Sequence, residues 1–198
     1  MSLLRNRSIL TPLALVALGT TALAVVGSGA VFTDSQAIGG NSFTTGSVDL
    51  SAEPTTAAVT LSNMAPGDVQ VGAITVDNPG SLAYRYALSS TTASTDAKGL
   101  AGQLVLTVKT GVTACTATGF VTDGTVVSGE GGPFGSAAGA AVFGSSATGA
   151  QAGDRTLAAT TSETLCVSVA LPLGTGNDFQ TANASATFTF DAEQTKNN

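Results

Sequence analysis

The segment "ASATFTFDA" (residues 184–192) decides the fold class. Alanine and phenylalanine occupy every second position, and hydroxyl or acidic residues occupy the positions between them. Successive side chains of a β-strand point to opposite faces of the sheet, so this period of two is typical of a strand with one buried face. The buried face is expected to carry Ala184, Ala186, Phe188, Phe190 and Ala192.

The same alternation recurs along most of the chain. It is clear in "QLVLTVK" (103–109) and "TLCVSVAL" (164–171), and further strands are expected at 42–50, 57–61, 69–77, 82–89 and 156–160. Turn sequences such as "APGD" (65–68) and "DNPG" (77–80) separate them. Apart from the N-terminal leader, no segment has a strong amphipathic helical pattern. The sequence therefore predicts an all-β protein, an antiparallel β-sandwich of jelly-roll type.

One region departs from this pattern. Residues 123–154 consist mainly of glycine, alanine and serine, a composition that buries little apolar surface for the entropy lost on ordering. We interpret the segment as a long flexible loop inserted into a domain that spans residues 42–194, with 195–198 as a tail. Its Gly-x-Gly fragments lack the lysine and the strand–helix context of a phosphate-binding loop.

The leader combines a short basic start with 26 uncharged residues, 8–33. Ser28 and Ala30 lie at positions −3 and −1 of a signal-peptidase cut before Val31, which predicts a cleaved signal peptide at residues 1–30. The uncharged run is also long enough to span a bilayer, so a retained N-terminal anchor is the alternative. Both interpretations place the domain outside the cytoplasm, and contact with a membrane is expected only through an uncleaved leader.

The charge balance excludes several classes of function. From residue 31 onward, five basic residues stand against thirteen acidic ones, a net charge of −8, so nucleic acid is not an expected partner. The chain has no histidine, which removes the Ser-His-Asp and Cys-His triads and the usual zinc sites. We expect no catalytic residues, no bound metal and no cofactor.

A weak calcium site at "GND" (176–178) or "DNPG" is the alternative to simple turns.

The chain has two cysteines, Cys115 and Cys166. An even number of cysteines in an exported protein predicts a disulfide, which would close a loop of about 50 residues and contribute about 4 kcal/mol in the chain-entropy estimate. Two buried free thiols are the alternative.

An ordered set of short motifs resembles one known family. The set comprises "AVFTD" (30–34), "NSFTTGSVDLS" (41–51), "VTLSNMAPGD" (59–68), "VDNPGSLAYRY" (76–86) and "LPLGTGNDFQ" (171–180), followed by "ATFTFDAEQ" (186–194). Together they resemble the TasA/camelysin (CalY) family, whose members carry a SipW-type signal peptide. The resemblance runs from about residue 9 to 194. The insert and the cysteine pair depart from the family pattern.

The resemblance implies a secreted jelly-roll protein that forms matrix fibres or stays at the cell surface. In the fibre mode, the freed N-terminal segment of one subunit adds as a strand to the sheet of the next, giving a head-to-tail homopolymer. Carried over to this chain, the assembly strand lies within residues 31–41 and includes Val31, Phe32, Thr33, Asp34, Ala37 and Ile38. The alternatives are that this segment is the domain's own first strand or a disordered terminus.

Two other functions stay open at this stage. A monomeric surface binding module would use the insert at 123–154 as its variable contact. The family name also implies a surface metalloprotease, for which a chain without histidine is poorly equipped. Expected partners are other copies of the chain, a signal peptidase of SipW type and accessory matrix proteins. Tyr84 and Tyr86 share one strand face, where they form either part of the core or a small ligand platform.

Overall fold

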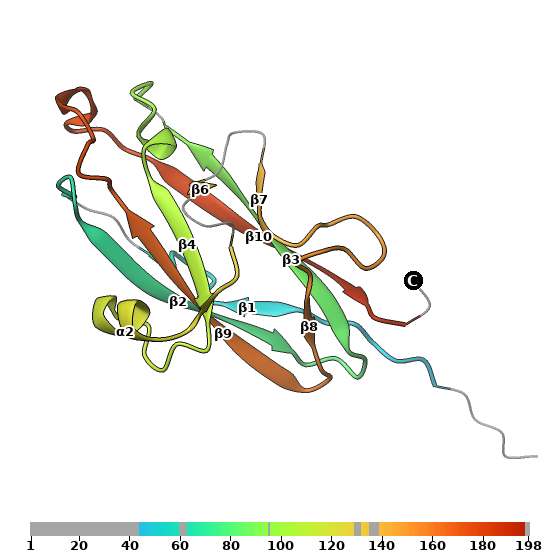
Figure 1. Cartoon of the computed structure of the whole chain (residues 1–198). Helices are drawn as coiled ribbons and strands as arrows, with labels where there is room; N and C mark the ends of the chain where they lie inside the picture. Colours follow the sequence, from blue (N-terminus) through green and yellow to red (C-terminus); the bar gives the residue numbers. More distant parts are fainter. Residues whose placement is uncertain (1–43, 60–62, 95, 129–131, 135–138, 197–198) are drawn as a thin grey trace, which may run out of the picture. The chain divides into compact units, whose positions relative to one another are not determined.

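The computed structural model describes residues 44–59, 63–94, 96–128, 132–134 and 139–196. They form two antiparallel sheets, which confirms the expected all-β sandwich (Figure 1). Sheet A has the order β1-β2-β9-β4-β5, with β6 also paired to β4. Its strands are β1 (Ser51–Glu53), β2 (Val69–Asn78), β9 (Thr161–Ala170), β4 (Val105–Thr110), β5 (Thr125–Val126) and β6 (Gly132–Pro133).

Sheet B has the order β10-β3-β7, with β8 also paired to β3. Its strands are β10 (Ser185–Gln194), β3 (Tyr84–Ala93), β7 (Ala140–Phe143) and β8 (Arg155–Leu157). Three short helical turns, η1 (Leu100–Gly102), α2 (Ala117–Thr122) and η2 (Asn177–Phe179), lie in the connections.

The core forms where the inner faces of the two sheets meet. Alternate residues of β2, β3, β4 and β9 are buried there, as their period of two predicts. Tyr84 and Tyr86 are 0% and 1% exposed and meet edge to face at 6.0 Å between ring centroids. These tyrosines therefore belong to the core, and the ligand-platform interpretation is wrong.

The strands expected near the start of the domain are the least accurate prediction. Residues 44–50 and 57–59 are not in strands, and the sheet begins instead at the three-residue β1. The carbonyl of Ser47 accepts hydrogen bonds of 3.1 Å from the amides of Ser81 and Leu82 in the β2–β3 loop. Because these contacts hold the backbone against a loop, it is not aligned with a sheet. β1 ends at Glu53, because the next residue, Pro54, has no amide proton for a ladder.

The segment 123–154 was expected to be a loop without regular structure, and this is wrong for its described residues. They include β5, β6 and β7, and Phe134, Val142 and Phe143 are at most 7% exposed. The average composition of the segment conceals these three apolar anchors, whose burial offsets the cost of ordering their flanks.

The predicted disulfide is confirmed: Cys115 and Cys166 are bonded, with their Cα atoms 5.4 Å apart. Cys166 lies on the outer face of β9, opposite the core residues Leu165 and Val167. Beside it on β4, Lys109 donates hydrogen bonds to the carbonyls of Phe120 (2.6 Å) and Asp123 (3.2 Å). The disulfide and Lys109 together attach the loop that carries α2 to sheet A.

Candidate assembly site

β10 lies at the margin of sheet B. β10 pairs with β3 along all ten of its residues, and no other described strand pairs with its opposite edge. A strand has hydrogen-bonding groups on both edges, so this edge presents backbone amides and carbonyls to which a further strand can be added. By contrast, β9 lies between β2 and β4 at the centre of sheet A.

An apolar groove runs beside this open edge. We call it the β10 groove; its volume is about 660 Å³. One wall is β10 from Ser185 to Phe190, the other is residues 52 and 54–59 from the start of the domain, and the floor is formed by Ile74, Leu104, Phe134 and Val169. The half-buried rings of Phe188 and Phe190 face this space. A strand added to β10 here would extend sheet B and cover both rings.

A second hollow continues the groove beyond the first residue of β10. This tip pocket has a volume of about 650 Å³ and shares Leu104 and Ala184 with the β10 groove. Its other lining residues come from 63–66, from Leu100 and from 171–183. Among the described residues that line it, none is Asp, Glu, Lys or Arg: side chains such as Met64, Leu171 and Phe179 form an apolar surface, and asparagine, glutamine and threonine residues add polar groups.

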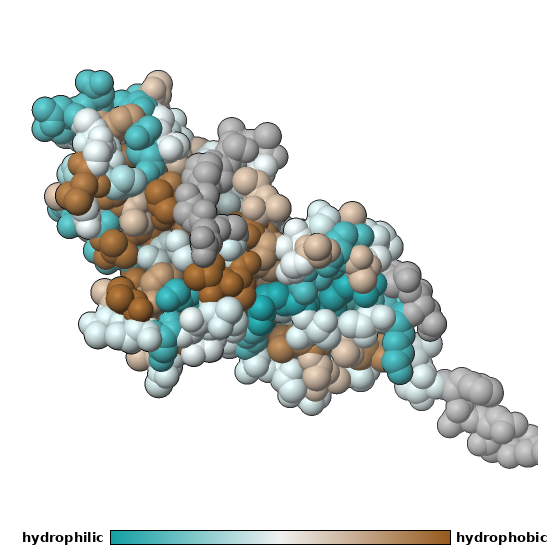
Figure 2. All heavy atoms as spheres, in the orientation of Figure 1, coloured by the Kyte–Doolittle hydropathy of each residue, from teal (hydrophilic) through white to brown (hydrophobic). Residues whose placement is uncertain are grey.

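The loops that form the tip pocket lie at the upper left of Figure 1. Figure 2 shows hydrophobic residues gathered over the left part of the same view, with hydrophilic residues at its upper-left corner. Val69 and Leu173, near this end of the domain, are 45% and 83% exposed. Exposed apolar side chains around a hollow are typical of a contact surface.

The chain begins its described course at the other end of the sandwich. Ser47 is bonded to the β2–β3 loop, and Gly46 lies so close to Leu82 that a Cβ there would be 2.5 Å from its Cγ. This loop adjoins Tyr84, which pairs with Gln194 at the far end of β10 from the tip pocket. The N-terminal side of the domain and the tip pocket are therefore separated by the length of β10.

Two charged clusters in the domain have a structural role. Glu163 on β9 accepts hydrogen bonds from Tyr86 (2.5 Å), Thr110 (2.8 Å) and Arg155, whose Nε lies 2.9 Å away. Burial alone would raise the pKa of Glu163, but these three donors lower it below the ordinary value. Burial and the hydrogen bond to Glu163 raise the pKa of Tyr86. The cluster therefore connects the two sheets through side chains whose polar groups are paired with one another.

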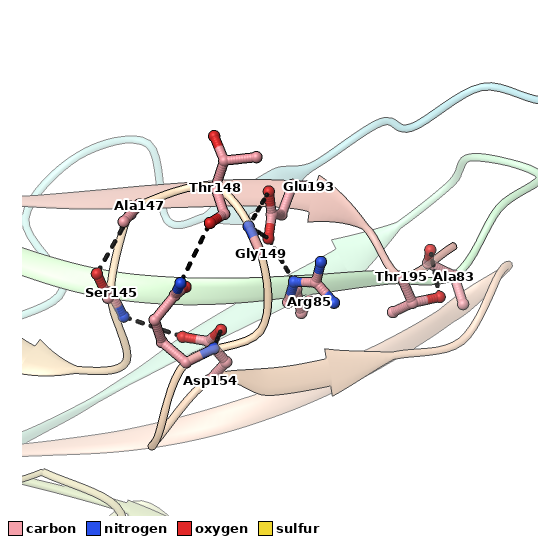
Figure 3. A network of polar contacts seen from close by, with 10 residues as sticks. Ala83, Arg85, Ser145, Ala147, Thr148, Gly149, Asp154, Glu193 and Thr195 are labelled. Carbon is pink, nitrogen blue, oxygen red and sulfur yellow. Dashed lines mark hydrogen bonds and ion pairs between the residues drawn. The ribbon is translucent and has the colours of Figure 1, made fainter. Parts of the chain in front are cut away.

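The second cluster holds a loop on the outer face of sheet B (Figure 3). Glu193 pairs with Arg85 and accepts a 2.9 Å hydrogen bond from the amide of Gly149. Asp154 closes the same loop by accepting from the amides of Ser145 (3.0 Å) and Gln151 (2.8 Å). These contacts hold the loop over the end of sheet B that carries Arg85 and Glu193, whereas Ser185, Thr187 and Thr189 on the outer face of β10 stay exposed.

The sequence-predicted residues of the N-terminus lie outside the described residues. These are the cleavage-site residues Ser28, Ala30 and Val31 and the assembly-strand residues Phe32, Thr33, Asp34, Ala37 and Ile38. The β10 groove itself was missed by sequence reasoning. The alternation in "TFTF" shows that β10 has one apolar face, but it carries no signal for which of its edges lacks a neighbour.

The geometry defines a disulfide-bonded β-sandwich with an open sheet margin beside an apolar groove. Residues 8–104, about half of the chain, match the family described as camelysin metallo-endopeptidase, which confirms the resemblance to the TasA/camelysin family. β10, the disulfide and the strands after residue 104 lie outside the matched region. No curated protein matches the chain.

The name of the family implies a bound metal ion, but the described residues do not provide a set of ligands that would hold one. Among them, no cluster of three or more potential metal-ligating side chains occurs. Glu163 and Glu193 are engaged by arginines, Asp154 by backbone amides, and both cysteines by the disulfide. The donor chemistry of a zinc site is therefore not assembled in this part of the chain. Within the same described ranges, no helix has the length and apolarity needed to cross a membrane.

Proposed function

We propose that the chain is a structural subunit of extracellular matrix or cell-surface fibres. In this proposal the leader is removed after Ala30, and the freed segment 31–41 of one subunit adds to the β10 edge of the next. The observation that carries the proposal is the open edge of β10 beside an apolar groove. The camelysin match supports a surface or matrix protein.

The N-terminal segment suits the groove in two ways. It supplies a free strand whose backbone can bond to β10, and each such bond contributes about 0.5–1.5 kcal/mol. It also supplies Phe32 and Ile38, which share one face of an extended strand and would bury apolar surface on the groove side of β10. The donating and accepting surfaces differ, so the contact does not close on itself and produces filaments.

The other partners follow from the same scheme. A signal peptidase of SipW type would release the segment, and accessory matrix proteins would bind the finished fibre. In this proposal the chain acts only as a structural subunit. The charged side chains of the two clusters hold the fold together, since each is paired within its own cluster. Metal, cofactor and proteolysis have no part in the proposal.

The test compares secreted protein that starts at Val31 with protein that starts at Gly39. N-terminal sequencing establishes where each begins, and negative-stain electron microscopy shows whether it forms filaments. We expect filaments from the first and single particles from the second.

The matched control is Val121→Ser in protein that starts at Val31. Val121 is 81% exposed on α2, outside both hollows, so this variant should form filaments. Filaments from the shortened protein, or single particles from the long one under all conditions, contradict the proposal. Single particles that bind a ligand would instead indicate a surface binding module.

A further inference from the structure

We propose that the tip pocket receives Phe43 of a second copy of the chain, and that the donated strand therefore runs antiparallel to β10. The inference rests on the proposed function and adds to it the direction of the strand and the end at which two subunits meet. Three observations support it: the reach of the chain, the length of the segment and the chemistry of the pocket.

The chain between Phe43 and Gly46 is too short for Phe43 to enter the tip pocket of its own subunit. Phe43 is covalently joined to Thr44, and two residues later Gly46 packs against Leu82 at the opposite end of the sandwich. The tip pocket lies beyond Ser185, at the other end of β10. Ten strand residues span about 33 Å, whereas two or three linking residues cover about 10 Å. Phe43 in the tip pocket must therefore come from another copy.

The length of the freed segment matches the path. Residues 31–43 are thirteen in number, and β10 has ten residues. If the segment pairs antiparallel to β10, its first part lies beside the C-terminal half of that strand. With Ile38 opposite Phe188, which places Ile38 on the groove side, residue 41 lies beside Ser185, and residues 42 and 43 pass it and reach the pocket lined by 181–184. In a parallel arrangement Phe43 would lie at the opposite end of β10.

The chemistry of the pocket fits these residues. The segment "NSF" (41–43) is uncharged, as is the lining of the pocket. Leu100, Leu171 and Phe179 offer an apolar surface to a phenyl ring, and side-chain amides of the rim offer partners to Asn41 and Ser42. The oxygen Oγ1 of Thr175, which lines the pocket, has no hydrogen-bond partner and is screened from solvent.

The direction of the strand decides what assembly results. With the antiparallel direction, the donor leaves the groove at the tip, so its β2–β3 loop end meets the tip of the acceptor. Every subunit then repeats the same end-to-end relation, and growth stays open. With the parallel direction, two β2–β3 loop ends would meet.

The direct experiment places the photoreactive residue p-benzoylphenylalanine at position 43 of protein that starts at Val31. Assembled material made from equal parts of light and heavy-isotope protein is irradiated, and the cross-linked peptides are sequenced. We expect mixed light–heavy pairs between residue 43 and residues 63–66, 100–104 or 171–184. Pairs to residues 80–84 or 190–194, or pairs confined to one copy, overturn the inference.

A substitution pair separates this inference from the proposed function. Gly176 lines the tip pocket and Gly174 does not, yet a Cβ at either position meets nothing within 4 Å. Gly176→Trp should fill the pocket and raise the critical concentration for filaments about tenfold or more, as should Phe43→Ala. Gly174→Trp should leave it unchanged.

If the parent protein assembles and all three variants match it, the inference fails while the proposed function stands. If the parent protein does not assemble at all, both fail together.

Discussion

β9 and β10 are both ten-residue strands with alternating sequences, yet they have opposite places in the fold. β9 has neighbours on both edges, and Leu165 to Val169 form a continuous buried run in which Cys166, on the outer face, is bonded to Cys115. β10 has one neighbour, and no residue in it is fully buried. From this difference we expect β9 of sheet A to contribute more to stability than β10, and under the proposed function assembly uses the margin of sheet B.

The largest difference in unfolding free energy is expected when one aspartate is placed in β9 and one in β10. Val167 on β9 is 0% exposed, so Val167→Asp buries an unpaired carboxylate and should cost about 4 kcal/mol or more of unfolding free energy. Thr187 on β10 is exposed, so Thr187→Asp should change the unfolding free energy by about 0.5 kcal/mol or less. Urea unfolding of the unassembled protein measures both. Equal losses would refute the assignment of stability to sheet A.

The disulfide should have the next largest effect. Replacing Cys115 and Cys166 together by serine should lower the unfolding free energy by about 2–4 kcal/mol, because the unfolded chain loses a constraint across 51 positions. Calorimetry of the double variant against the parent protein measures the change. Since the disulfide lies on sheet A, filaments should still form from this variant below its unfolding temperature. Loss of filaments in folded protein would show that sheet A takes part in assembly.

Glu163 on β9 and Glu193 on β10 each form an ion pair with an arginine, so removing each charge tests how much the two strands contribute to stability. Glu163→Gln removes charge from a carboxylate held by Tyr86, Thr110 and Arg155, and should cost about 1–3 kcal/mol near neutral pH. Glu193→Gln on β10 should cost about 1 kcal/mol or less, because Glu193 is more exposed to solvent.

The contribution of Glu163 should also appear in the pH dependence of the unfolding free energy. The pKa of Glu163 is lowered in the folded protein, so its contribution is present above the ordinary pKa and is lost as the pH falls through the lowered value. In the parent protein the unfolding free energy should therefore fall below about pH 4.5, and in Glu163→Gln this fall should be shallower. Parallel pH profiles for the two proteins would contradict the assigned role of Glu163.

The smallest effect on stability is expected at the margin itself. Thr187→Lys with Thr189→Lys places two charges on exposed positions of β10 and should change the unfolding free energy by about 0.5 kcal/mol or less. Electron microscopy of the same variant should nevertheless show no filaments, since a lysine at 187 lies beside the β10 groove. Normal filaments would mean that β10 is not the accepting edge.

The sequence predicted where the strands lie along the chain better than it predicted which strands pair in the sheets. The period of two located β2, β4, β9 and β10 closely, since alternation is a local consequence of strand geometry. It failed at residues 44–50, where contacts with Ser81 and Leu82 hold the backbone, and in the insert, where Phe134, Val142 and Phe143 contribute to the core. The β10 groove depends on which strand ends a sheet, a property that no single segment encodes.

Hydrogen exchange tests the central claim most directly, because it reports on each strand in the unassembled and the assembled protein. We predict that amides within residues 185–190 of β10 exchange at least about tenfold more slowly in filaments, while those of 165–169 in β9 remain unchanged. Filaments in which β10 exchanges as fast as in single particles would contradict the claim that its open edge accepts the strand of a neighbour.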